Sequence, residues 1–351
     1  MAQYLSKKAQ SITPYVAGEQ PKGKNIIKLN TNENPYPPSP KVIRATKAAI
    51  GAELRKYPDA TGGSFRQAAA QYVGLQETNI FCGNGSDEVL GFAFQAFFEP
   101  GEPVASPDIS YSFYPVWAKL YDITLKMIPL DKDFCLDPED YYQSEGGVII
   151  ANPNAPTGIA ISKDMVEAIV KNNPNKVVII DEAYVEFGAE SAVDLITTYE
   201  NLLVVRTLSK SQSLAGMRAG FAVGSETLID GLNRVKDSFN SYPIDRITEA
   251  TAAAALIDKA YYQKANARVI ETREWTTTAL KAIGMTVLPS KTNFVFAKPN
   301  EQSARAVFEY LKTKSIYVRW FDKPRIKDFL RITIGNPKEM RALVDAIKTM
   351  K

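Results

Sequence analysis

The sequence predicts an α/β fold in which a mostly parallel sheet lies between helices. Short apolar runs recur between residues 79 and 223, and helix-like stretches separate several of them. Three of these runs, 148–151, 177–180 and 202–205, are apolar at every position. Such continuous runs are typical of strands that are buried on both faces, as in a parallel sheet covered by helices on each side.

The strands can be placed in chain order. The first thirty residues are irregular, and 29–40 is an extended loop rich in proline and asparagine. Helices are expected from residue 87 to about 98, and over 165–171 with Ser162 as its cap. The strands are expected at 79–82, 103–105, 123–128, 148–151, 177–180, 202–205 and 219–223.

The pattern changes after Pro243. Residues 248 to about 283 are helical in character, and strands are expected at 293–297 and 329–335 between further helices. This pattern predicts a smaller α/β domain at the C-terminal end. We therefore expect three parts: an N-terminal arm that packs with the small domain (1–30), a large domain (31–245), and a small domain that begins with a long interdomain helix (246–351).

Composition excludes several classes of protein. Of the 351 residues, 45% are hydrophobic and 23% charged, as in ordinary globular proteins. The net charge is only +3, and no basic stripe alternates with aromatic residues, so no nucleic-acid partner is expected. Cys82 and Cys135 are far apart in the chain and suggest no disulfide framework, which favours the reducing cytoplasm. No signal peptide, membrane span or membrane partner is expected.

Histidine is absent from the chain. Its absence excludes Ser-His-Asp triads, Cys-His pairs and histidine-ligated metals, and no metal site is expected. Any proton transfer must therefore use Lys, a carboxylate, Tyr or Cys.

Polar segments follow four of the expected strands: GNGSDE (83–88), NPNAPTG (152–158), DEAY (181–184) and TLSK (207–210). Because the carboxyl ends of parallel strands share one edge of a sheet, these segments should converge there. Ser86 and Asp87 begin a helix, whose N–H groups can bind a phosphate. An ordinary capped helix would show the same pattern.

Asp181 and Lys210 each follow an apolar strand. Asp181 is either a solvated or salt-bridged strand end, or a carboxylate that faces a pyridinium nitrogen. Lys210 lies in SKSQSLAGMRAGF, and a lysine in a semi-buried cleft near cations can act as a nucleophile. Ser209 and Arg218 could hold a phosphate beside it. Together these groups match the requirements of a phosphorylated aldehyde cofactor with a pyridine ring.

The same segment, SKSQSLAGMRAGF, resembles the lysine signature of the fold-type I, class II aminotransferases. Together with LNTNENPY, KYPD, GNGSDE, NPNAPTG and DEAYVEF, it resembles the histidinol-phosphate aminotransferase family. The similarity extends from Tyr15 to FLRITIG near the C-terminus. It implies a fold-type I transferase that depends on pyridoxal phosphate, with a seven-stranded large domain, and a homodimer with shared active sites.

The resemblance also implies roles for individual residues around the cofactor. Lys210 binds the cofactor covalently and shuttles the proton, Asp181 pairs with the pyridine nitrogen, and Tyr184 hydrogen-bonds the phenolic oxygen. Tyr111 stacks on the ring, although a core aromatic would look the same in the sequence. The phosphate is assigned to Ser86, Asp87, Ser209, Arg218 and, from the neighbouring subunit, Tyr57.

For the substrate, the resemblance assigns the anionic group to Arg331, with Arg319, Tyr15 and Asn34 as further contacts. The chain departs from the family pattern at Ala155, where an asparagine that donates to the cofactor's phenolic oxygen is usual. Asn154 could replace that donor, or Tyr184 could act alone. At Pro37 a glycine is common.

The implied activity is exchange of an amino group between L-histidinol phosphate and 2-oxoglutarate, a step of histidine biosynthesis. Three alternatives remain open from the sequence: an aromatic amino-acid aminotransferase, a lyase like the threonine-phosphate decarboxylases, and a non-catalytic protein that binds pyridoxal phosphate.

Overall fold

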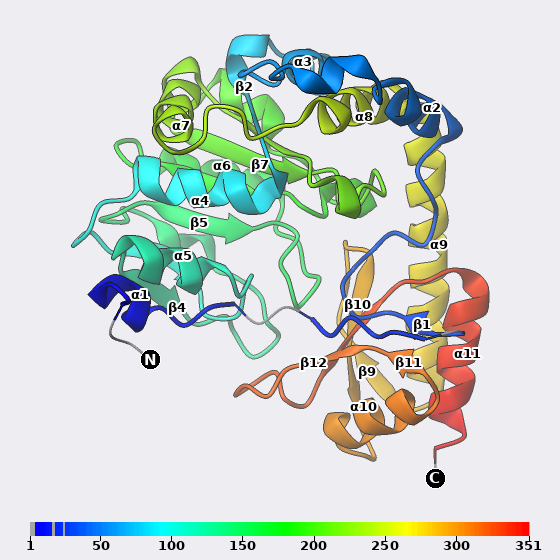
Figure 1. The fold of residues 1–351 in the computed structure, drawn as a ribbon. Coiled ribbons are helices and arrows are strands. Elements are labelled where there is room, and N and C mark those ends of the chain that lie inside the picture. The colour runs from blue at the N-terminus through cyan, green and yellow to red at the C-terminus, as the bar shows by residue number, and fades with distance from the viewer. Residues whose placement is uncertain (1–3, 16–17, 24, 351) are drawn as a thin grey trace.

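A seven-stranded sheet forms the centre of the larger of two lobes (Figure 1). The computed structural model describes residues 4–15, 18–23 and 25–350. The strands lie in the order β2-β8-β7-β6-β5-β3-β4, and β8 is the one strand that runs in the direction opposite to the other six. All seven predicted strands are present within two residues of their expected ends, which confirms the α/β class. Their bounds are β2 Ile80–Gly83, β3 Val104–Pro107, β4 Leu125–Ile128, β5 Val148–Ala151, β6 Val178–Asp181, β7 Leu202–Thr207 and β8 Gly220–Val223.

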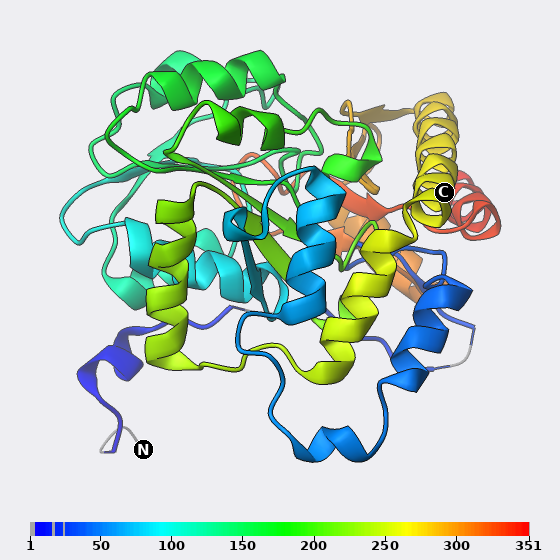
Figure 2. The same cartoon turned by 90° about the horizontal axis from the view of Figure 1, so that it is seen from above.

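Alternate residues of the central strands pack on opposite faces of this sheet. Ile150 and Ile180 face one apolar cluster, whereas Ile149 and Ile179 face another. Burial on both faces explains why the strands have no polar alternation. The first face is covered by α3 (Gly63–Val73), α6 (Lys163–Lys171) and α8 (Arg246–Ile257), and the second by α4 (Gly85–Phe97), α5 (Tyr114–Tyr121) and α7 (Glu226–Phe239) (Figure 2).

The smaller lobe contains an antiparallel sheet in the order β12-β13-β10-β9. Leu29 joins its core, and the two-residue strand β1 (Ile27–Lys28) pairs in parallel with β11 (Ile316–Tyr317). By contrast, α1 (Lys7–Ser11) lies against α5 of the large lobe, where Lys8 pairs with Asp122. The N-terminal segment therefore contacts both lobes (Figure 1). The other small-lobe elements are β9 Met285–Val287, β10 Phe294–Pro299, α10 Ala304–Thr313, β12 Arg319–Trp320, β13 Leu330–Thr333 and α11 Pro337–Lys348.

The long helical region expected after residue 248 consists of two helices, which corrects the prediction. The chain leaves helical geometry at Asp258, whose carboxylate pairs with Lys41, before α9 (Lys259–Ala282) begins. α8 packs beside α3 and α2 (Pro40–Ala48), so the large lobe extends beyond residue 245, where the sequence placed its end. α9 then leads to the small lobe (Figure 1). In the described part of the chain, no helix is long and apolar enough to cross a membrane.

Candidate active site

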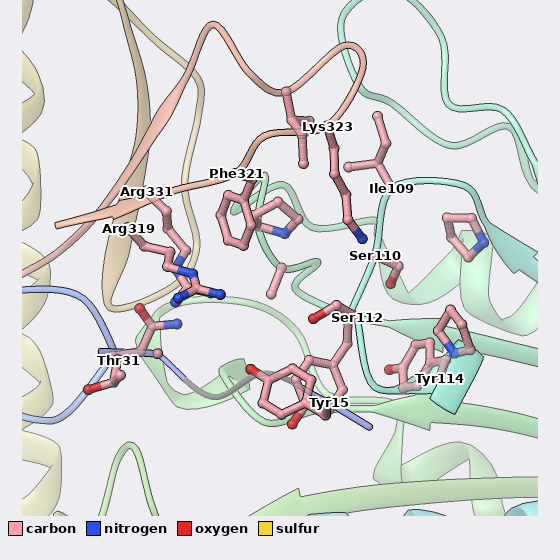
Figure 3. Close-up of a pocket in the computed structure, with 18 of the residues that line it drawn as sticks. Tyr15, Thr31, Ile109, Ser110, Ser112, Tyr114, Arg319, Phe321, Lys323 and Arg331 are labelled. Atoms are coloured by element: carbon pink, nitrogen blue, oxygen red, sulfur yellow. The ribbon is translucent and has the colours of Figure 1, made fainter. Parts of the chain in front are cut away.

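Two adjoining chambers open at the carboxyl edge of the parallel strands, where the two lobes meet. The inner chamber has a volume of about 130 Å³ and the outer chamber about 360 Å³. Both are lined by Tyr111, Ala155, Tyr184 and Lys210, so they form one continuous site. Figure 3 shows the outer chamber, with Arg319 and Arg331 from the small lobe facing Tyr15 and Ser112.

The inner chamber brings together most of the residues that the sequence assigned to a cofactor. They come from segments that are distant in the chain but follow β2, β3, β6 and β7 in the sheet. The shared carboxyl edge of the strands explains this convergence. The predicted residues in its wall are Ser86, Asp87, Tyr111, Asp181, Tyr184, Ser209, Lys210 and Arg218.

One end of the inner chamber has the chemistry of a phosphate site. α4 begins there at Gly85, which has φ 80°, and the side chain of its N-cap residue Asn84 makes no capping hydrogen bond. Arg218 reaches the same end and pairs with Asp87 at 2.9 Å, while the hydroxyl groups of Thr207 and Ser209 hydrogen-bond each other at 3.0 Å. Helix N–H groups, hydroxyls and a guanidinium are all donors that suit a phosphate.

Gly220 lets β8 approach this helix start closely. A Cβ at Gly220 would lie 2.4 Å from the backbone nitrogen of Ser86 and 2.5 Å from the carbonyl carbon of Gly85. Backbone atoms cannot rotate away, so Gly220→Ala should displace the start of α4. We expect a loss of stability of about 1–3 kcal/mol and several-fold faster loss of pyridoxal phosphate on dialysis.

The matched control is Gly216→Ala in the same sequence segment, because nothing lies within 4 Å of a Cβ added there. Thermal unfolding and absorbance after dialysis measure both effects. Equal behaviour of the two variants would contradict this role for Gly220.

Asp181 lies in the wall of the same chamber and is 5% exposed. Its carboxylate accepts hydrogen bonds from the Tyr114 hydroxyl at 3.0 Å and from the Ala183 N–H at 3.1 Å. Burial raises the pKa of Asp181 to about 6, although both hydrogen bonds oppose that rise. None of the described residues forms an ion pair with it. A buried carboxylate without a cation fits a ligand that brings a protonated ring nitrogen.

Lys210 lies between the two chambers. Its amine donates a hydrogen bond to the carbonyl of Thr31 at 3.2 Å. Burial, together with the nearby charge of Arg331, lowers the pKa of Lys210 to about 8. A sizeable fraction of the amine is therefore neutral in weakly alkaline solution and available as a nucleophile.

Asn34 was expected in substrate binding, but neither chamber is lined by it. Its side-chain amide instead donates to the carbonyl oxygen of Lys210 at 3.0 Å. The structure thus places Asn34 behind the lysine loop, where it holds the backbone that carries the amine.

Tyr184 and Asn32 form a hydrogen bond that the sequence did not predict. The Asn32 amide donates to the Tyr184 phenolic oxygen at 2.9 Å, so the phenol keeps its own hydrogen to donate elsewhere. Thr333 of the small lobe donates to the Asn32 carbonyl oxygen at 3.0 Å and fixes the amide. LNTNENPY stood out as a motif, but nothing in it indicates which asparagine reaches the site. In the same way, nothing in SYSFY (110–114) indicates that Tyr114 is the aromatic residue that hydrogen-bonds Asp181.

Asn154 does not supply the missing donor that was considered from the sequence. Its amide donates to the Ile109 carbonyl at 2.9 Å and to the Thr157 hydroxyl at 3.1 Å, and neither chamber is lined by it. The adjacent Ala155 does line both chambers, with only a methyl group. Neither Asn154 nor Ala155 therefore provides the second donor that is usual in the family, and Tyr184 is the donor that remains.

Two arginine side chains, Arg319 and Arg331, line the outer chamber. Arg331 uses one terminal nitrogen to donate to the Asn30 carbonyl at 2.9 Å, whereas its buried Nε has no partner in the structure. Burial lowers the pKa of Arg331, and the nearby charge of Arg319 adds to this effect. Figure 3 shows the two guanidinium groups side by side. Tyr15 lines the same chamber and stacks on Phe113 at 4.8 Å.

Tyr57 lies outside both chambers of its own chain. It is 80% exposed, and its ring stacks on Tyr242 with the centroids 4.8 Å apart. The phosphate contact expected of Tyr57 therefore requires a second subunit.

Comparison with known proteins identifies the class. Residues 24–347 match the family described as aminotransferase class I and II. The chain belongs to this family.

Particular relatives are more specific. The chain is 51% identical to a histidinol-phosphate aminotransferase of Clostridium botulinum (strain Okra / Type B1), over 99% of this chain and 98% of the relative. It is 54% identical to histidinol-phosphate aminotransferase 1 of Bordetella parapertussis, over 99% of each. Among solved structures, the histidinol-phosphate aminotransferase of Sinorhizobium meliloti in complex with pyridoxal-5′-phosphate superposes with a TM-score of 0.89 at 26% identity, covering 99% of this chain and 97% of that one.

Proposed function

We propose that this protein is a pyridoxal-phosphate-dependent aminotransferase that exchanges the amino group between L-histidinol phosphate and 2-oxoglutarate in histidine biosynthesis. The observation that carries the proposal is the position of Lys210 between the two chambers. The inner chamber has donors that suit a phosphate and a buried carboxylate, and the outer chamber has the paired arginines. The names of the relatives support the choice of substrate.

The residues have distinct tasks in this proposal. When bound, pyridoxal phosphate supplies a ring that withdraws electrons from the substrate's α-carbon. Asp181 would keep the ring nitrogen protonated, and Tyr184 would donate its hydrogen to the phenolic oxygen of the ring. Lys210 would hold the cofactor through its amine and would carry the proton from the α-carbon of the substrate. Arg331 and Arg319 orient the substrate through its anionic group.

Substrate kinetics separate this proposal from its alternatives. Initial rates of glutamate formation from 2-oxoglutarate are measured with histidinol phosphate, tyrosine and phenylalanine as amino donors. We expect histidinol phosphate to give the highest kcat/KM. A higher value for an aromatic amino acid would favour the aromatic aminotransferase, carbon dioxide release from threonine phosphate would favour the lyase, and no turnover at all would favour a binding protein.

We further propose that the enzyme acts as a cytoplasmic homodimer with shared active sites. The segment that carries the short 3₁₀ helix at Ala52–Arg55 projects from the body of the subunit (Figure 2). It exposes Ile50, Leu54 and Tyr57, and Tyr242 beside it is also exposed. Exposed apolar residues grouped in this way support an interface.

Tyr57→Phe tests the shared site. Removing one exposed hydroxyl should leave folding unchanged but remove a hydrogen bond to the partner's cofactor phosphate. We expect pyridoxal phosphate to dissociate several-fold faster, as measured by dialysis of the dimer, with Tyr242→Phe as the control. An unchanged dissociation rate, or a monomer in sedimentation experiments, would contradict the shared phosphate site.

A further inference from the structure

Lys323 adds a second cationic position to the outer chamber. We propose that Lys323 binds the distal carboxylate of the dicarboxylate substrate, glutamate or 2-oxoglutarate, while Arg319 and Arg331 bind the anionic group nearer the reacting carbon. This inference rests on the proposed function and makes Lys323 a specificity-determining residue for one of its two substrates.

The position of Lys323 is distinct from that of the arginine pair. Lys323 lies on the connection between β12 and β13 and lines the outer chamber. In Figure 3 its amine points into the chamber beside Ser110, and the ring of Phe321 lies between it and the two guanidinium groups. The chamber therefore offers two separate places for negative charge.

The charges around Lys323 leave it available for a ligand. Among the described lining residues of the outer chamber, Asp108 is the only carboxylate. Arg325 forms an ion pair with the Asp108 carboxylate at 2.8 Å, and the Leu130 N–H donates to the other oxygen of that carboxylate at 3.0 Å. No carboxylate of the described residues pairs with Lys323, so an anionic ligand would be its first ionic partner.

The same arginine holds the connection in place over the chamber. Arg325 donates to the carbonyl groups of Leu130 and Asp131 at 2.7 and 2.6 Å, in addition to its pair with Asp108. Ile326 packs in an apolar cluster with residues of both lobes, including Ile109 and Phe296. The Lys323 carbonyl accepts the N–H of Lys327 at 2.9 Å. Its backbone is therefore fixed before any ligand arrives, which reduces the entropy lost on binding.

The two proposed substrates differ in the feature that Lys323 would recognise. Histidinol phosphate has one anionic group, its phosphate, and an imidazole at the other end. Glutamate and 2-oxoglutarate have carboxylates at both ends of a five-carbon chain. A lysine on a long, partly solvated stem can approach a carboxylate and can also move aside for a neutral ring. One chamber can in this way accept both molecules.

The test measures the two half-reactions of the holoenzyme separately, by absorbance after rapid mixing. We expect Lys323→Met to lower the rate constant of the half-reaction with 2-oxoglutarate, measured at low substrate concentration, about fivefold, which is the upper range for an exposed ion pair. The rate constant of the half-reaction with histidinol phosphate should fall less than twofold. Lys323→Arg should retain most of the activity. Lys327→Met, on the same connection but outside the chamber wall, is the control. Equal losses for both substrates, or no loss for either, would overturn the proposal.

A binding experiment separates failure of this inference from failure of the proposed function. Glutarate and pentanoate have the same chain length, but only glutarate has a second carboxylate. We expect Lys323→Met to raise the Kd of the holoenzyme for glutarate about fivefold and to leave the Kd for pentanoate unchanged. This result would stand even if histidinol phosphate proved not to be a substrate. Equal changes for glutarate and pentanoate would refute the role of Lys323.

Discussion

Replacing Lys210 with alanine is expected to lower turnover by about 10⁴-fold or more, because the variant loses both the nucleophile and the proton carrier. Among the described residues, Lys210 is the only lysine that lines both chambers. The chain contains no histidine that could take over the proton. The rate of glutamate formation measures this effect directly.

The same variant separates covalent attachment from binding. The phosphate end of the inner chamber is formed by other residues, among them Ser209 and Arg218, so Lys210→Ala should still bind pyridoxal phosphate. Borohydride reduction followed by mass spectrometry should attach the cofactor to the wild-type protein and not to the variant. Turnover near the wild-type level, or a labelled variant, would rule out Lys210 as the cofactor lysine.

Asp181→Asn is expected to have the second largest effect on activity, about 10²–10³-fold in kcat, the loss typical of removing one electrostatic contact at a reacting centre. The amide has the shape of the carboxylate but cannot keep a ring nitrogen protonated. Because the side chain is buried, no water molecule can replace the lost charge effectively.

The same substitution should stabilise the protein when no cofactor is bound. The folded-state pKa of Asp181 is about 6, above the usual value of 3.8, so the native state binds more protons than the unfolded state between about pH 4 and 6. Its contribution to the free energy of unfolding therefore falls as pH rises through this window. Above the window, the ionised carboxylate costs about 3 kcal/mol, a cost that Asp181→Asn removes.

Denaturant unfolding of the apoenzyme at several pH values measures this difference. The stability gained by Asp181→Asn should be largest at pH 7–8 and should shrink as the pH is lowered toward 4. Tyr114→Phe, which removes only a hydrogen-bond donor to the carboxylate, is the control and should not stabilise the protein. A variant that is less stable than wild type at pH 8 would contradict the burial of an unpaired charge.

The strands and the convergence at their ends could be predicted because their signal is local. Runs such as 177–180 are apolar for as long as they are buried on both faces, and the polar residue that follows, here Asp181, marks the edge of the sheet. Helices such as α2 and α7 were not predicted from the sequence. They were missed because amphipathic stretches in loops and in helices look alike without their packing partners.

The parts of the site that depend on contacts between the lobes could not be predicted. Asn32 reaches Tyr184 because β13 holds it through Thr333, which lies 301 residues further along the chain. Asn34, two residues away in the same motif, turns to the backbone of Lys210 instead. Lys323 lies in a segment without any motif, and the contacts of Arg325 and Ile326 with the large lobe place it over the chamber.

The most direct test of the proposed function mixes purified holoenzyme with L-histidinol phosphate alone, without a keto acid, while the absorbance of the bound cofactor is recorded. We expect the visible band of the enzyme to convert to that of the aminated cofactor, and 2-oxoglutarate added afterwards to restore it. If histidinol phosphate leaves the band unchanged while phenylalanine or tyrosine converts it, the site is that of an aminotransferase with another substrate. If cofactor-saturated protein shows no such band at all, the assignment of Lys210, and with it the proposed function, is contradicted.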